Sequence, residues 1–132
     1  MKISNKTKRY LLLAQRVATQ SIHDHFKHGA VLVKGGSVLN TAFNKDNYNR
    51  FGNRFRDTRT RGHATHHAEL GCVLGLDRSI TNGATMYVIR TNRLGQFRMS
   101  KPCIMCEEVM KFCGIKKVVY TTGESSVEKR RL

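Results

Sequence analysis

The chain has 132 residues, 39% of them hydrophobic, which fits one globular domain over residues 1–132 with a single core. Lys and Arg number 24 against 9 Asp and Glu, so the formal charge of +15 indicates anionic partners such as phosphorylated small molecules or nucleic acid. No apolar run approaches the ~18 residues of a membrane-spanning helix. No signal-peptide pattern follows the basic start, so we expect a cytoplasmic protein with reduced thiols and no membrane partner.

Hydrophobic periodicity and turn residues predict alternating helices and strands. In chain order, with approximate bounds, the expected elements are a helix over about 4–26, strands over about 30–33 and 37–43, a helix over about 66–75, strands over about 85–90 and 96–99, a helix over about 103–112 and a last strand over about 117–121. The residues from Ser125 onward read as a short basic tail. This order indicates an α/β sandwich with an antiparallel first strand pair and parallel additions.

The stretch from Asn44 to about Thr65 follows neither the helical nor the strand period. Loops of this length inside compact domains are usually functional or disordered. Arginine grips phosphate oxygens with two parallel hydrogen bonds, so we expect substrate contacts from this loop. The expected contact residues are Arg50, Arg54, Arg56, Arg59, Arg61 and His63.

A second pattern combines His67 and Glu69 with Cys103 and Cys106. Zinc prefers nitrogen and sulfur ligands in tetrahedral geometry, and three such ligands leave a fourth position for water. The two cysteines stand three residues apart at a predicted helix start, so they face the same way and lie where thiolates are favoured. Glu69 can sit beside the water and shuttle its protons.

The alternative is a structural zinc site or two incidental thiols. A structural site would normally use a fourth Cys or His. Cys72 and Cys113 fall on apolar stretches inside predicted helices, so we interpret them as core cysteines.

The arrangement of His67 and Glu69 followed by Pro102-Cys103-Ile104-Met105-Cys106 resembles the zinc deaminase signature. Further segments, 28–33, 43–44, 84–88 and 114–120, are similar to the cytidine deaminase superfamily, so the resemblance covers nearly the whole chain. It implies a three-layer α-β-α sandwich around a central mixed sheet of about five strands. It also implies one Zn²⁺ per chain on His67, Cys103 and Cys106, with Glu69 as the catalytic residue.

The same resemblance implies that Asn44 contacts the sugar of the substrate and that the backbone of Ala68 contacts the base. Two features depart from the family pattern. A basic insertion, residues 90–101, precedes Pro102, and we expect it to form a hairpin near the site. Few residues follow Thr121, so we expect a fifth strand or final helix to be missing or brief.

The resemblance implies hydrolytic deamination, in which zinc-bound hydroxide attacks C4 of cytosine or C6 of adenine and ammonia leaves. Our first hypothesis is conversion of cytosine to uracil in a nucleotide of the deoxycytidylate type. The alternative is a cytidine or adenosine deaminase acting on single-stranded DNA or RNA, which the +15 charge and the aromatic residues Phe51 and Phe55 favour. The Cys103-Ile104-Met105-Cys106 motif also resembles that of tRNA adenosine deaminases, so adenine remains a possible target base.

A third hypothesis is a binding module with an inactive site. Glu69 argues against it, because a structural site has no use for a carboxylate at that position. Relatives in the superfamily usually assemble, so we expect a homo-oligomer.

Overall fold

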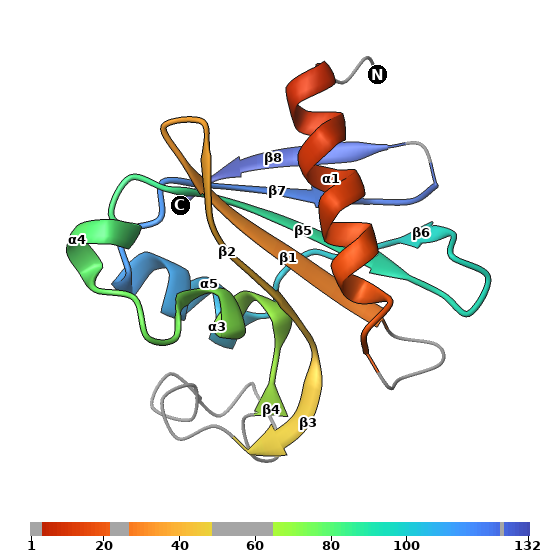
Figure 1. Cartoon of the computed structure of the whole chain (residues 1–132), viewed down its shortest axis with the longest axis horizontal. Coiled ribbons are helices and arrows are strands. Elements are labelled where there is room, and N and C mark those ends of the chain that lie inside the picture. Colours follow the sequence, from red (N-terminus) through yellow and green to blue (C-terminus); the bar gives the residue numbers. More distant parts are fainter. Residues whose placement is uncertain (1–3, 22–26, 49–64, 125) are drawn as a thin grey trace.

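The computed structural model describes residues 4–21, 27–48, 65–124 and 126–132, and Figure 1 shows helices arranged around a twisted sheet. The elements in chain order are α1 (Asn5–Ala18), β1 (Lys27–Lys34), β2 (Ser37–Phe43), β3 (Lys45–Tyr48), β4 (Thr65–His66), α3 (Ala68–Val73), α4 (Arg78–Thr81), β5 (Thr85–Thr91), β6 (Phe97–Arg98), α5 (Ile104–Phe112), β7 (Lys117–Thr121) and β8 (Val127–Arg131).

The main sheet is mixed, as expected, and its strands follow the order β2-β1-β5-β7-β8, with β6 paired to the end of β5. A parallel pair joins β5 to β7, in the register Tyr87 to Val119. The neighbouring pairs β1–β2, β1–β5 and β7–β8 are all antiparallel. The predicted parallel addition is therefore confirmed for β7, which pairs with β5, and wrong for β5, which pairs antiparallel with β1.

Side chains on the two faces of the sheet alternate along each strand and form two hydrophobic clusters. On one face, Val31, Ile89 and Val119 pack against Tyr10 and Ala14 of α1. On the other face, a second set of strand side chains packs against α3 and α5: Ala30, Leu32, Met86, Val88, Val118 and Tyr120. Helices on both faces of a mixed sheet confirm the three-layer α/β prediction (Figure 1).

Helix α1 begins where Ser4 Oγ accepts a hydrogen bond from the backbone N–H of Thr7, at 3.1 Å. It ends at Ala18, and Thr19 Oγ1 donates to the carbonyl of Arg16 at 2.7 Å. The predicted continuation toward residue 26 is wrong for residues 19–21, which leave the helix, and residues 22–26 lie outside the described part.

Gly29 lets α1 approach β1 closely. A Cβ added at Gly29 would collide with the Ala14 carbonyl and would lie 3.0 Å from the Ala18 amide nitrogen. The helix backbone therefore rests directly on the strand where the two elements cross. Any larger residue at Gly29 would have to push α1 outward.

Four elements were not predicted from the sequence. Strand β8 occupies the segment interpreted as a solvated tail, and β3 and β4 lie at the two ends of the stretch interpreted as a loop. The short helix α4 begins at Asp77, whose carboxylate accepts a hydrogen bond from the Ser79 amide at 2.9 Å. No helix in the described ranges has both the length and the apolar character needed to cross a bilayer.

Candidate metal centre

Two helix starts bring the predicted zinc ligands together. His67 follows β4 as the N-cap of α3, and Cys103 is the N-cap of α5, both with extended backbone. Cys106 lies in the first turn of α5 and is buried, whereas Cys103 is exposed. Leu70 of α3 packs in one cluster with Val109 of α5, which holds the two helix starts side by side.

The distances within this group fit a zinc ion. His67 Nδ1 lies 3.2 Å from Cys106 Sγ and 3.7 Å from Cys103 Sγ. A tetrahedral ion with the usual Zn–N and Zn–S lengths would place such nitrogen and sulfur atoms about 3.6 Å apart. Within the part of the chain that the structure describes, these three residues form the only group of His, Cys, Asp or Glu that could hold a metal.

Glu69 lies in the first turn of α3 with only 4% of its surface exposed. Its Oε1 atom has no hydrogen-bond partner among the described residues, which is costly for a buried carboxylate. An unpartnered buried carboxyl oxygen next to two thiols and an imidazole is the donor set expected around a metal-bound water. The residues present therefore fit one zinc ion.

The four groups shift one another's protonation. Burial raises the pKa of the Glu69 carboxyl, although the charge on His67 opposes this shift. Hydrogen bonding with Cys106 lowers the pKa of the Cys103 thiol to about 4, and the same pairing together with burial raises the pKa of Cys106. The Cys103 hydrogen bond raises the pKa of His67. Cys103 is therefore the thiolate of the pair before a metal binds, and Cys106 carries the proton that the metal would displace.

Comparison with known proteins decides the family. The profile described as "Cytidine and deoxycytidylate deaminase zinc-binding region" matches residues 4–122. The chain belongs to this family. The match and the His67, Cys103 and Cys106 group confirm the prediction of a zinc-binding deaminase that can hold one metal ion. A search of curated proteins found no match.

Solved structures share the fold of this deaminase. The dCMP deaminase of cyanophage S-TIM5 in its apo form superposes with a TM-score of 0.61 at 20% identity, over 92% of this chain and 86% of that one. The same enzyme in complex with dCMP and dUMP gives 0.59 at 19% identity, over 92% and 85% of the two chains. RibD of Acinetobacter baumannii gives 0.55 at 19% identity over 89% of this chain, which spans only 28% of RibD.

Asn44 stands in this deaminase where β2 ends. Its side-chain Oδ1 accepts a hydrogen bond from the backbone N–H of His28 at 2.9 Å, and its own N–H donates to the His28 carbonyl at 3.3 Å. These bonds fix the side chain at the edge of β1. Ala68 is fully buried at the first position of α3, between the candidate ligand His67 and Glu69.

Sequence reasoning missed the role of Ser100, which lies between β6 and Pro102. Helix α5 begins where the pattern predicted it, with Cys103 as its N-cap. Ser100 Oγ is buried and contacts the Val88 carbonyl at 2.9 Å and Thr121 Oγ1 at 2.8 Å. Ser100 therefore ties the segment that carries Cys103 to β5 and β7. Its position between a turn and a proline gave no signal of this contact.

The structure describes only one of the two basic segments that the sequence analysis singled out, the insertion before Pro102. The arginine loop residues Arg50, Arg54, Arg56, Arg59, Arg61 and His63 lie outside the described residues. The insertion before Pro102 does form the expected hairpin, with Arg90 opposite Arg98 and Thr91 opposite Phe97. Its turn contacts α1, because Gln15 Nε2 donates to the Gly95 carbonyl at 3.1 Å. This contact is on the face of the sheet that α1 covers, and α3 and α5 cover the other face.

Cys72 and Cys113 are buried core residues, as predicted. Cys72 packs in the cluster beneath α3, and burial raises the pKa of its thiol far above the ordinary range. Cys113 caps the far end of α5. Neither belongs to the group of candidate metal ligands in the described structure.

Proposed function

We propose that the chain is a zinc-dependent hydrolytic deaminase that converts cytosine to uracil in a nucleotide of the deoxycytidylate type. His67, Cys103 and Cys106 hold the zinc ion, and Glu69 is the catalytic proton shuttle. The observation that carries this proposal is the buried Glu69 carboxyl, whose Oε1 has no partner among the described residues and which lies beside the three candidate ligands.

When bound, zinc lowers the pKa of a coordinated water to about 7 and so supplies a nucleophile near neutral pH. Glu69 Oε1 accepts a proton from this water and passes it to the ring nitrogen N3 of cytosine. The carboxyl then carries the second water proton to the leaving amine, so that cytosine and water become uracil and ammonia. Burial supports this role, because a raised carboxyl pKa makes Glu69 a better proton acceptor close to neutral pH.

Backbone and side-chain groups of the chain are proposed to position the base, the sugar and the phosphate of the substrate. The first N–H groups of a helix have no acceptor within the helix, so the start of α3 at Ala68 offers a donor to the base. Asn44, fixed at the end of β2, is the proposed contact for the sugar. The arginines of the 50–61 segment and His63 are the proposed contacts for the phosphate.

The test offers zinc-loaded protein dCMP, cytidine, single-stranded DNA and single-stranded RNA, and follows ammonia release and base conversion. Turnover of dCMP, with none on the strands, is the expected result. Activity confined to strands and falling steeply with added salt would exclude the nucleotide hypothesis.

The second candidate function is deamination of cytosine or adenine in a single strand, and a cluster of cations supports it. Burial, together with the charges of its cationic neighbours, lowers the pKa of Lys117. These neighbours come from α1, β8 and the residue before β7: Lys6, Lys116, Lys129 and Arg131. Such a cluster favours the phosphate backbone of a nucleic acid. An adenine-containing strand joins the substrate panel for this reason.

A further inference from the structure

Helix α5 starts at the metal centre, and an acidic side chain in its first turn meets the last strand of the sheet. Glu107 Oε1 lies 2.8 Å from Arg130 Nη2 of β8 and 3.6 Å from Lys111 Nζ, which is one turn further along α5. Only 16% of the Glu107 side chain is exposed, against 42% for Arg130. The contact is therefore partly shielded from water and is screened by salt less than an ion pair on the open surface.

The pairing of β8 with β7 directs Arg130 toward α5. Arg130 stands opposite Val118, which packs in the hydrophobic cluster that α3 and α5 cover. Side chains alternate along a strand, so Lys129 and Arg131 lie on the opposite face, where Val127 of β8 packs in the cluster beneath α1. Of these three consecutive cations, β8 thus presents Arg130 to the helix that carries the cysteines.

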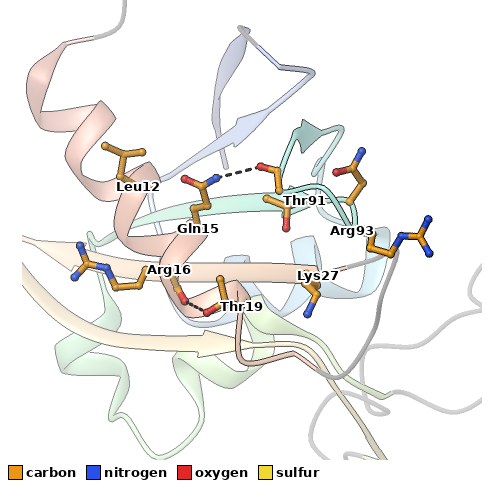
Figure 2. A pocket seen from close by; sticks show the side chains of 9 residues that line it. Leu12, Gln15, Arg16, Thr19, Lys27, Thr91 and Arg93 are labelled. Atoms are coloured by element: carbon orange, nitrogen blue, oxygen red, sulfur yellow. Dashed lines mark hydrogen bonds between the residues drawn. The ribbon is translucent and has the colours of Figure 1, made fainter.

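Cations elsewhere in the described structure do not converge in this way. Figure 2 shows the Arg16 and Arg93 side chains pointing away from each other at the two ends of the cavity between α1 and the turn that joins β5 to β6. Carboxylates are scarce in this chain, which has 9 Asp and Glu against 24 Lys and Arg. A carboxylate that engages two cations at the start of α5 is therefore a specific feature of this helix.

Glu107 directly follows Cys106 and closes the first turn of α5 on the other cysteine. Its backbone N–H donates to the Cys103 carbonyl at 2.9 Å, and the backbone N–H of Cys106 donates to Cys103 Sγ at 3.5 Å. Glu107 is thus held at its backbone by the turn and at its side chain by β8. The place of both cysteines relative to His67 therefore depends on where Arg130 holds Glu107.

We propose that Arg130 is a positioning residue of the metal centre, a role that rests on the zinc ligands of the proposed function. Through Glu107 it holds the first turn of α5 and keeps Cys103 and Cys106 in place for the metal. Ligands that are already in place bind a metal more tightly, because less order has to be created on binding. Groups outside the ligand set that orient the ligands commonly tune metal affinity in this way.

The experiment measures the zinc dissociation constant of the full-length protein by competition with a chromophoric chelator. It compares the wild type with Arg130→Gln, Glu107→Gln and the variant that combines both. By charge alone, the loss of a cation near Zn²⁺ would strengthen zinc binding, whereas the loss of positioning weakens it. Arg131→Gln is the matched control, because it removes the same charge from the same strand on the opposite face. Glu108→Gln controls for the loss of a carboxylate from α5.

We expect Arg130→Gln to raise the zinc dissociation constant about fivefold, the upper end of what a partly exposed ion pair contributes. The combined variant should bind zinc no more weakly than Glu107→Gln, because both lose the same contact. Arg130→Lys keeps the charge and should recover most of the affinity. The visible absorption bands of Co²⁺-substituted protein, which report ligand geometry, should shift in Arg130→Gln and not in Arg131→Gln.

Zinc binding in Arg130→Gln that equals or exceeds that of the wild type would overturn the proposal, even if the metal-free variant melts at a lower temperature. Equal losses of affinity in Arg130→Gln and Arg131→Gln would overturn it as well, because the contact with Glu107 would then have no special effect. A wild type that binds no zinc would contradict the ligand set itself, and with it the proposed function.

Discussion

His67 Nδ1 and Cys106 Sγ lie 3.2 Å apart, although 39 residues separate them in the sequence. The two atoms sit at the starts of different helices, and both helices pack in the same hydrophobic cluster, to which α3 contributes Leu70 and α5 contributes Val109. The metal centre is therefore formed jointly by the starts of α3 and α5. A substitution that weakens the packing between these two helices should lower both the zinc affinity and the local stability of the protein.

Cys106→Ser should lower the zinc content of the purified protein from about one ion per chain to far below one, because a hydroxyl is a much poorer ligand than a thiolate. Elemental analysis measures this loss, and a chelator should lower the melting temperature of the wild type but not of the variant. Cys113→Ser is the matched control at the other end of α5 and should keep its zinc. A variant Cys106→Ser that retained a full equivalent of zinc would remove Cys106 from the ligand set.

Glu69→Gln should retain zinc and reduce turnover by about 10²–10⁴-fold, since an amide of the same shape cannot carry the proton. Glu69→Ala should behave in the same way. Steady-state rates with the preferred substrate, measured beside the zinc content, check both variants. Glu108→Gln removes an exposed carboxylate from α5 and should keep wild-type activity. Full activity in Glu69→Gln would show that the proton moves by another route.

Metal-free protein should be alkylated at Cys103 at a nearly constant rate between about pH 5 and pH 8, because the thiolate is the reactive form. Hydrogen bonding with Cys106 lowers the pKa of the Cys103 thiol to about 4, so deprotonation is already complete at the lower end of this range. An ordinary thiol would instead react about tenfold faster per pH unit below its pKa of about 8.5.

Mass spectrometry after iodoacetamide treatment gives the rate at each cysteine. Cys72 is the internal control, because burial raises the pKa of its thiol and keeps it unreactive. Zinc should protect Cys103 near neutral pH, and this protection should weaken toward pH 5, where protons compete with the metal for the ligands. A rate at Cys103 that climbs steadily up to pH 8 would contradict the predicted thiolate.

Ser100→Ala should destabilise the protein by about 1–3 kcal/mol, the usual cost of leaving buried polar partners unsatisfied. The lost contacts join the segment before Cys103 to Val88 and Thr121, so zinc affinity should fall as well. Denaturant unfolding and competition with a zinc chelator measure the two effects. Ser37→Ala removes an exposed hydroxyl from the start of β2 and should leave both quantities unchanged.

The sequence was sufficient to predict the elements whose hydrophobic period is strong. The strands at 30–33 and 37–43 and the helix that follows Cys103 lie where the pattern placed them. The side chains of His67, Cys103 and Cys106 also lie together as the zinc prediction requires, because zinc chemistry demands particular residue types at helix starts. The catalytic role of Glu69 stays a prediction.

The rest depended on contacts that are distant in the sequence. Strand β8 buries only Val127 and exposes the other four residues, so its pattern resembles a solvated tail. The antiparallel pairing of β1 with β5 depends on the arrangement of the whole sheet, and the residues of the two strands carry no local sequence pattern that indicates it. Helix α4 did have a local signal in the Asp77 cap, but its four residues are too few to show a helical period.

Strand β8 also constrains how copies of this chain can associate. It ends the main sheet, and its outward residues Lys129, Arg130 and Arg131 are exposed. A second copy that continued the sheet through an antiparallel β8–β8 pair centred on Lys129 would place the two Lys129 side chains opposite each other, which is unfavourable across strands. The positive charge of this edge strand thus disfavours association of two copies edge to edge. We expect the homo-oligomer to form through other surfaces.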